Sequence, residues 1–245
     1  MASFSKLGNY GRCGNAMSQI AATIAHAFRM GEKAYFPNWK YRKYFKLNHP
    51  NIIFSQNIPK MKNKYQEPCY DYRPIPPLKN CDLFGYMQSY HYFSDYEDLI
   101  RKLFSPKQSI NNGQYREYCS VHVRRTDYLK HAGCYTILGP DYYYKAAELV
   151  PQNKFLVFSD DREWCKKNLT DSRFIITDSA PDYVDFFLQS ACSSNIIANS
   201  SFSWWAAWLN SNPEKVVIAP KKWFGPKLSP THPTNNLIPK EWLRV

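Results

Sequence analysis

The second half of this sequence predicts an α/β fold in which a parallel sheet is covered by helices on both faces. From about residue 116 onward, short apolar runs alternate with segments of helical pattern, and polar clusters follow several of the apolar runs. Strands that are buried on both faces read as short continuous apolar runs, and their alternation with helices is typical of a parallel sheet.

The first half of the chain has a weaker pattern. Residues 11–15 form a tight glycine turn, and Met17, Ile20, Ile24 and Phe28 follow at three- and four-residue steps. This single apolar stripe predicts a helix that ends near Gly31, followed by a short strand at residues 34–36. Residues 40–80 are rich in Lys, Asn, Pro and Tyr, and we expect short helices and loops there.

The second half gives an ordered series of elements. Strands are expected at residues 118–123, 155–158, 174–176, 196–198 and 216–219. Helices are expected at residues 140–149, from a cap at 159–161 to about 168, at 182–192 and at 201–209. A polar loop is expected directly after the first of these strands. We therefore divide the chain into an amino-terminal domain, residues 1–115, and a carboxyl-terminal domain, residues 116–245.

Composition and charge narrow the class of protein. The chain has 245 residues, of which 44% are hydrophobic and 21% charged, and this balance indicates a globular protein. The formal net charge of +12 favours an anionic partner, which could be a nucleotide, a polyphosphate, an anionic membrane surface or nucleic acid. Lysine and arginine are spread along the chain, whereas nucleic-acid-binding domains concentrate them in one stripe.

The cysteines and the hydropathy pattern bear on cofactors and location. None of the 7 cysteines lies in a CxxC motif or at a zinc-binding spacing, so free thiols and no metal site are expected. The first residues lack the apolar stretch of a signal peptide, and no run approaches the ~20 apolar residues of a membrane span. We expect a soluble, cytoplasmic protein.

Polar residues cluster where three of the expected strands end, at residues 122–127, 159–161 and 199–201. Ligands of open parallel sheets bind beyond the carboxyl ends of the strands, so these clusters predict a binding site. Arg124 and Arg125 leave a buried strand together, and a guanidinium matches two phosphate oxygens. Alternation along a strand points the two side chains in opposite directions, so one faces the ligand. Alternatively, an arginine, Arg125 above all, pairs with Asp127.

The cluster at residues 199–201 opens a helix. Ser200, Ser201 and the backbone N–H of Phe202 offer donors at the positive end of the helix dipole, which suits an anion. Equally, one of the serines is an ordinary helix cap with no ligand. The three tryptophans that follow in this helix are expected to pack in the core.

Asp160 and Asp161 admit three roles: recognition of a guanine edge, metal binding, or capping of the next helix. We favour guanine for one and capping for the other. In the first half, the amide of Asn15 suits contact with a sugar or an acceptor hydroxyl, although a Gly-Asn turn is more often structural.

Five ordered motifs resemble those of the α1,2-fucosyltransferase family. They are Gly-Arg-Cys-Gly-Asn at 11–15, Leu-Phe-Gly-Tyr-Met-Gln-Ser at 83–89 with Tyr92 and Phe93 after it, His-Val-Arg-Arg-Thr-Asp at 122–127, Phe-Ser-Asp-Asp at 158–161 with Trp164 and Cys165, and residues 195–208. The chain departs from the family at Ala16, where Gln is usual, and at Thr126, where Gly is frequent. It is also shorter in its amino-terminal half, which the family uses for the acceptor.

The resemblance implies a two-lobed, GT-B-like glycosyltransferase, with the acceptor in the cleft and the nucleotide on the carboxyl-terminal lobe. It implies transfer of L-fucose from GDP-β-L-fucose to a glycan hydroxyl, α1,2 to galactose or a similar sugar, with inversion and without a metal ion. No nucleic acid partner and no membrane span are expected.

The resemblance also suggests roles for individual residues. Arg124 would be the main counter-charge of the departing diphosphate, with Ser200, Ser201 and the Phe202 N–H beside it. Asp160, or else Asp161, would recognise guanine together with His122, and Arg125 would complete the donor site. Asn15 would lie near the fucose or the attacking hydroxyl, and Asp127 would either orient Arg124 or accept a proton. Two alternatives remain open: another GDP-deoxyhexose as donor, and a basic glycan- or nucleic-acid-binding protein without enzymatic activity.

Overall fold

The computed structural model describes residues 1–108, 112–131 and 133–245 and divides the chain into two compact units. Unit 1 consists of Met1–Gln108 and Thr231–Pro239, and unit 2 of Ser109–Pro230 and Lys240–Val245. The boundary predicted at residues 115 and 116 therefore lies inside unit 2. The return of Thr231–Pro239 to unit 1 was not predicted.

Unit 1 contains a five-stranded parallel sheet in the order β3-β2-β1-β5-β4. Its strands are β1 (Ala2–Ser3), β2 (Ala34–Phe36), β3 (Ile52–Phe54), β4 (Asn63–Gln66) and β5 (Cys81–Phe84). Its helices are α1 (Cys13–Arg29), α2 (Glu97–Leu103) and the short 3₁₀ segments η1 (Arg42–Tyr44), η2 (Tyr90–Tyr92) and η3 (Ser94–Tyr96). The prediction of short helices and loops across residues 40–80 was wrong in one respect, because β3 and β4 lie there.

The predicted first helix and the strand after it are confirmed. Met17, Ile20 and Ile24 of α1 are fully buried, as the apolar stripe requires. Gly31 follows the helix with φ of +66°, a left-handed conformation that a residue with a Cβ atom adopts at a cost. The chain then enters β2 directly.

Unit 2 contains a six-stranded parallel sheet in the order β11-β10-β9-β6-β7-β8. Its strands are β6 (Cys119–Val123), β7 (Phe155–Ser159), β8 (Phe174–Ile176), β9 (Ser194–Ile196), β10 (Val217–Ala219) and β11 (Leu243–Arg244). Its helices are η4 (Asn112–Tyr115), α3 (Thr126–Lys130), α4 (Pro140–Ala147), α5 (Arg162–Asn168), α6 (Asp182–Ala191) and α7 (Ser201–Leu209). The five predicted strands and four predicted helices are confirmed, with β9 both beginning and ending earlier than expected. The loop predicted after β6 instead contains α3, and β11 was not predicted.

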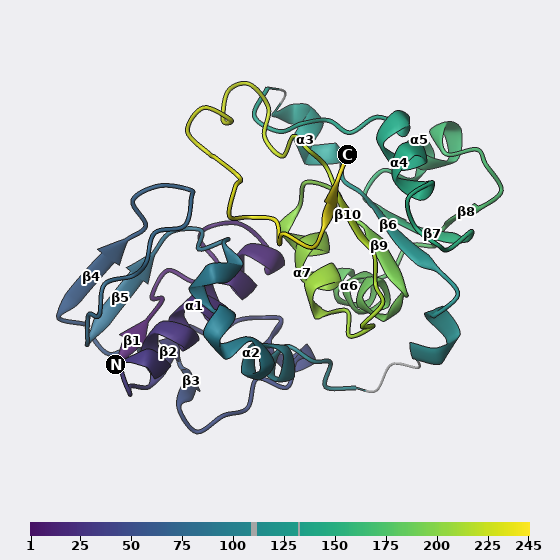
Figure 1. Ribbon diagram of the computed structural model, residues 1–245. Helices are drawn as coiled ribbons and strands as arrows, with labels where there is room; N and C mark the ends of the chain where they lie inside the picture. Colours follow the sequence, from purple (N-terminus) through teal and green to yellow (C-terminus); the bar gives the residue numbers. More distant parts are fainter. Residues whose placement is uncertain (109–111, 132) are drawn as a thin grey trace. The chain divides into compact units, whose positions relative to one another are not determined.

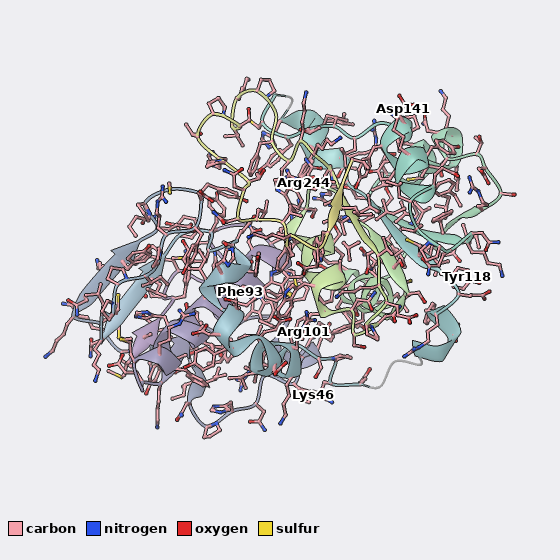
Figure 2. The ribbon with its side chains drawn as sticks, in the orientation of Figure 1. Lys46, Phe93, Arg101, Tyr118, Asp141 and Arg244 are labelled. Carbon is pink, nitrogen blue, oxygen red and sulfur yellow. The ribbon has the colours of Figure 1, made fainter. Side chains whose placement is uncertain are left out.

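Helices cover both faces of this sheet, with α4 and α5 on one side and α6 and α7 on the other (Figure 1). The core on the α4 side contains Tyr143, Phe155 and Cys165, all fully buried. Side chains fill the space between sheet and helices (Figure 2). The predicted layer arrangement is therefore confirmed.

The strand order of unit 2 fixes where a ligand can bind. The chain runs from β6 outward to β7 and β8, and then returns to add β9, β10 and β11 on the other side of β6. The connections that leave β6 and β9 thus run in opposite directions, and in open parallel sheets ligands bind beyond the carboxyl ends of strands at such a point. In unit 1, β1 and β5 are neighbouring parallel strands, and β5 is the last strand of that sheet along the chain.

Two further features concern the expectations about thiols and membranes. The seven cysteines, which all lie in the described ranges, are free thiols. Within the part of the chain that the structure describes, no helix has the length and apolar character needed to cross a membrane.

Candidate functional site

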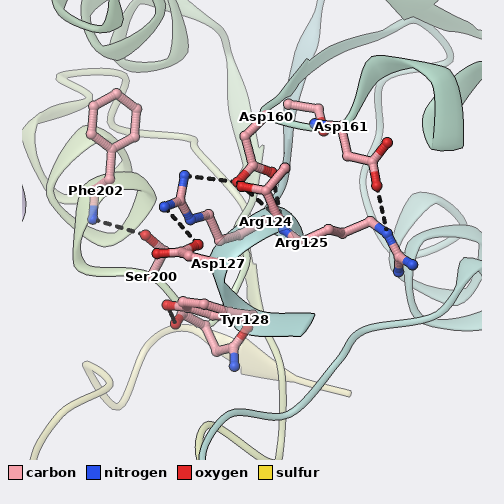
Figure 3. A network of polar contacts seen from close by, with 11 residues as sticks. Arg124, Arg125, Asp127, Tyr128, Asp160, Asp161, Ser200 and Phe202 are labelled. Carbon is pink, nitrogen blue, oxygen red and sulfur yellow. Dashed lines mark hydrogen bonds and ion pairs between the residues drawn. The ribbon is translucent and has the colours of Figure 1, made fainter. Parts of the chain in front are cut away.

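Arg124 lies at the carboxyl end of β6 between two carboxylates. Its Nη2 is 2.7 Å from Oδ1 of Asp127, and its Nη1 is 2.9 Å from Oδ2 of Asp160 (Figure 3). The sequence left open an ion pair of Asp127 with either arginine, Arg125 above all, and the structure pairs Asp127 with Arg124. The two ion pairs fix the plane of the guanidinium from two sides.

Arg125 points away from Arg124, as strand alternation predicts (Figure 3). Its guanidinium lies 4.0 Å from the centre of the Trp164 ring, and its Nε is 3.3 Å from Oδ2 of Asp161. A guanidinium on an aromatic face with a carboxylate beside it is a stable structural arrangement. The contacts of Arg125 are therefore with α5 and the residue that caps it.

Asp160 holds the backbone that follows Arg124. Its Oδ1 accepts the N–H of Arg125 at 2.9 Å, and its Oδ2 accepts the N–H of Thr126 at 3.3 Å and the Thr126 hydroxyl at 2.5 Å. Both oxygens thus have partners within the chain, in addition to the ion pair with Arg124. Asp161, in turn, caps α5 by accepting the N–H of Trp164 at 3.1 Å, so the predicted capping role is confirmed for one of the two aspartates.

The amino terminus of α7 follows β9, the neighbour of β6. Ser200 is its N-cap, and the Ser200 hydroxyl accepts the N–H of Phe202 at 3.3 Å. The alternative in which a serine caps the helix is therefore correct for Ser200 and the N–H of Phe202. The hydroxyl of Ser200 lies beside Asp127 (Figure 3). The Phe202 ring packs 5.6 Å from the ring of His122, so the first turn of α7 lies against the end of β6.

His122 is a buried neutral side chain next to the arginine. Burial, with the positive charge of Arg124 as a smaller cause, lowers the pKa of His122 to about 3. Among the described residues, no hydrogen-bond partner exists for its buried Nδ1 atom. Buried polar atoms normally have partners, so this nitrogen is a candidate for contact with a ligand.

Tyr128 connects the end of β6 with the segment that precedes α7, and it was not identified from the sequence. Its hydroxyl donates to the carbonyl oxygen of Asn199 at 2.9 Å, its ring stacks on Tyr135 at 4.2 Å, and the Arg124 guanidinium carbon lies 5.8 Å from its ring centre. Burial raises the pKa of Tyr128, so the hydroxyl keeps its proton. The residue was overlooked because its segment was predicted to be a loop. A helical reading of residues 126–130 would have turned attention to it.

Arg124, Asp127 and Asp160 therefore come together in unit 2 with Ser200 beside them, whereas Arg125 points away from them and Asn15 belongs to unit 1. There the Asn15 Oδ1 accepts a hydrogen bond from Gln88 Nε2 at 2.8 Å. A Cβ atom on Gly11 would lie 2.0 Å from Asn15 Nδ2, which explains the glycine at this position. Asn15 thus links the first glycine turn to the segment after β5.

No metal centre emerges from the ranges described: no group of three or more His, Cys, Asp and Glu side chains there could hold an ion.

Comparison with known proteins gives the class and the family of this chain. Residues 10–244 match the profile described as "Glycosyl transferase family 11". The chain therefore belongs to glycosyltransferase family 11, and the predicted family and enzyme class are confirmed.

Individual relatives are similar over most of this chain. The O-antigen biosynthesis glycosyltransferase WbnK of Escherichia coli is 29% identical, with 75% of this chain and 80% of WbnK aligned. An α-1,2-colitosyltransferase of Escherichia coli is 32% identical, over 67% of this chain and 62% of its own length. The human galactoside α-(1,2)-fucosyltransferase 1 is 27% identical over 81% of this chain. The chain covers 63% of that human protein.

A solved structure supports the fold class. The fucosyltransferase NodZ from Bradyrhizobium superimposes with a TM-score of 0.51 at 14% identity, covering 79% of this chain and 88% of NodZ. At this level of identity the likeness concerns the fold alone, and it confirms the predicted GT-B-like class.

Proposed function

We propose that this chain transfers L-fucose from GDP-β-L-fucose to a glycan hydroxyl, α1,2 to galactose or a similar sugar, with inversion at the anomeric carbon. The observation that carries the proposal is the position of Arg124 beside the amino terminus of α7, at the carboxyl ends of two strands where the sheet order reverses. The similarity to the human α-(1,2)-fucosyltransferase supports the same sugar and linkage.

The chemistry follows from where charge develops. In a direct displacement, the bond between the anomeric carbon and the GDP oxygen breaks, and negative charge grows on the β-phosphate. Arg124 has five N–H donors, and its ion pairs to Asp127 and Asp160 use one on each terminal nitrogen. The remaining donors can bind the diphosphate, together with the hydroxyls of Ser200 and Ser201 and the dipole of α7. Such preorganised donors stabilise the transition state more than the ground state.

Arg125 is left out of this donor set, because its guanidinium is engaged with Trp164 and Asp161. Asp127 is given the orienting role rather than that of the base, since it forms an ion pair with Arg124 at 2.7 Å. A carboxylate stabilised by such a pair is a weaker proton acceptor.

Guanine recognition is proposed for His122, supported by its buried and unpartnered ring nitrogen in the described structure. Asp160 has a structural role, because both its oxygens accept hydrogen bonds within the chain. In the proposal, Asp160 also contacts guanine. Nucleotide selectivity separates these roles. If a variant has lower activity on both donors but keeps its preference for GDP-fucose over ADP-fucose, the replaced residue positions other groups of the site and does not recognise the base.

A second donor deserves a direct comparison, because the α-1,2-colitosyltransferase is 32% identical to this chain. Colitose is fucose without its 3-hydroxyl. If activity with GDP-colitose is higher than with GDP-fucose, the donor is GDP-colitose. The proposed diphosphate site would be the same for both donors.

The test is an assay with GDP-fucose, a panel of β-galactosides and other glycans, and parallel samples with a chelator. We expect a fucosylated product whose new α1,2 linkage is identified by NMR. If no GDP-sugar is consumed and calorimetry detects no binding of GDP, the proposal is wrong and the basic glycan- or nucleic-acid-binding alternative gains support.

A further inference from the structure

Unit 1 carries a pair of exposed tyrosines at the carboxyl ends of β1 and β5. Tyr10 lies between β1 and α1, and Tyr86 follows β5. They are 38% and 39% exposed, more than any other Phe, Trp or Tyr side chain of the described ranges. Their rings contact each other edge to face, with centres 6.3 Å apart. Exposed aromatic rings that gather at one place mark binding surfaces more often than scattered ones do.

Hydrogen bonds from buried side chains hold the backbone that carries these rings. The side-chain amide of Gln19, fully buried, donates to the carbonyl oxygen of Tyr10 at 3.3 Å and to that of Gly85 at 3.1 Å. Buried Glu67 accepts the N–H groups of Tyr86 at 2.7 Å and of Met87 at 3.1 Å. One amide therefore ties the two loops together, and one carboxylate fixes the turn that carries Tyr86.

The same turn is built around an unusual backbone. Gly85 has φ of +141°, and a Cβ atom there would lie 2.4 Å from Cβ of Glu67. Met87 also has positive φ, at +51°. Such backbone conformations cost energy, and they persist where the surrounding contacts hold them in place, often at binding sites.

Polar groups border the aromatic pair. Tyr70 packs 6.0 Å from Tyr86 and 4.9 Å from His232, and its hydroxyl donates to the Gln88 side chain. Gln88 Nε2 donates in turn to Asn15 Oδ1 at 2.8 Å. A ring surface bordered by amide and hydroxyl groups suits a pyranose, which offers an apolar C–H face and a rim of hydroxyls.

We propose that Tyr10 and Tyr86 form the surface on which a galactose-type ring of the acceptor glycan packs, with the Tyr70–Gln88–Asn15 hydrogen-bond chain along its hydroxyl rim. This rests on the proposed function, since it identifies the residues that bind the acceptor of the proposed reaction. It assigns these residues to acceptor binding rather than to the donor.

The test compares Tyr86→Ala and Tyr10→Ala with Tyr86→Trp, and it uses methyl β-galactoside and lactose as probes. Removal of one aromatic anchor should raise the acceptor KM roughly tenfold, whereas Trp, which keeps a large ring, should stay within about threefold of wild type. GDP binding measured by calorimetry should not change, because these residues belong to the unit without the diphosphate site. Leu149→Ala, which removes a side chain of a residue that is 46% exposed in unit 2, is the matched control.

Saturation-transfer NMR with the same two sugars separates this inference from the proposed reaction. Loss of the sugar signal in Tyr86→Ala but not in Leu149→Ala supports the surface even if GDP-fucose is not the donor. An unchanged acceptor KM and sugar signal in both alanine variants, with circular dichroism showing intact folding, would overturn it.

Discussion

The replacement of Arg124 by lysine tests whether the geometry of the guanidinium, and not its charge alone, carries the donor site. Arg124 reaches two carboxylates at once, at 2.7 Å from Asp127 and 2.9 Å from Asp160. A lysine ammonium keeps the charge, but it is a single point on a flexible chain and cannot hold both partners while it donates to a phosphate.

The expected magnitude follows from the contacts that are lost. A hydrogen bond to a charged group contributes about 1.5–3 kcal/mol, and loss of one preorganised donor to a developing anion costs about 2.7–4 kcal/mol in the transition state. We therefore expect Arg124→Lys to lower kcat/KM for GDP-fucose by roughly 10²–10³-fold. Arg124→Ala should fall at least as far, because it also leaves Asp127 and Asp160 without their cation.

The assay is steady-state transfer with GDP-fucose, together with calorimetric binding of GDP. Arg125→Lys is the matched control from the neighbouring position, since the Arg125 guanidinium lies 4.0 Å from the Trp164 ring centre and pairs with Asp161. It should lower the melting temperature more clearly than it lowers the transfer rate. If Arg124→Lys keeps more than half of the wild-type rate, or if Arg125→Lys is the more damaging of the two, the assignment of Arg124 is wrong.

The remaining predictions concern three carboxylates and the metal. Asp160→Asn should lower kcat/KM about 10²-fold for GDP-fucose, because an amide cannot accept all the hydrogen bonds of the carboxylate, and the proposed guanine contact should make the loss larger for GDP-fucose than for ADP-fucose; an equal loss on both would contradict that contact. Asp127→Asn removes one negative charge near the diphosphate and should strengthen GDP binding by about 1 kcal/mol, roughly fivefold by calorimetry, and weaker binding would contradict this. Burial raises the pKa of Glu67 from its ordinary value of 4.5 to about 6. The folded state thus binds this proton more tightly than the unfolded state does, and the carboxyl lowers stability as pH rises through that window, by ~2 kcal/mol. Urea unfolding of Glu67→Gln should lack that decrease relative to wild type; identical pH profiles would refute it. Transfer should be unchanged by a chelator, and restoration of lost activity by an added divalent cation would oppose this.

Unit 2 was predictable because its central strands are buried on both faces. Cys119–Val123 and Phe155–Ser159 are mostly apolar, and every residue of the first is buried. The start of β9 was misjudged because it contains Asn195, a buried polar residue whose amide donates to the Ser120 hydroxyl and to the Gln189 carbonyl oxygen, each at 2.7 Å. These partners satisfy the amide inside the sheet, but the low hydropathy of asparagine predicts a loop at this position.

Unit 1 was less predictable for the opposite reason. The β4 segment Asn63–Gln66 is an edge strand with mostly exposed residues, so it shows no apolar run. The β1 strand has two residues, and both are recognisable only through their pairing with β2 and β5. Strands of this kind are defined by neighbours distant in the sequence, which composition does not reveal.

The composition of the candidate site could be predicted, but its internal pairing could not. Strand ends and helix caps placed Arg124, Asp160 and Ser200 together in advance. Which carboxylate meets which arginine depends on contacts between β6 and β7, such as the hydrogen bond from the Arg125 N–H to Asp160. The role of Tyr128 depends likewise on Asn199, far along the chain.

For the proposed reaction, the charges at the end of β6 bear on how a cationic protein would hold an anionic donor without binding it irreversibly. Two guanidinium groups, Arg124 and Arg125, face three carboxylates, Asp127, Asp160 and Asp161, so the cluster itself has an excess of negative charge. His122 adds none, because its lowered pKa keeps it neutral. In the proposed donor site, attraction for the diphosphate would then come from directed donors, namely the Arg124 N–H groups, the serine hydroxyls and the dipole of α7, rather than from net charge. Directed donors favour the geometry in which a leaving diphosphate gains charge, and in the proposed reaction the surrounding carboxylates would weaken the hold on GDP once the sugar has been transferred.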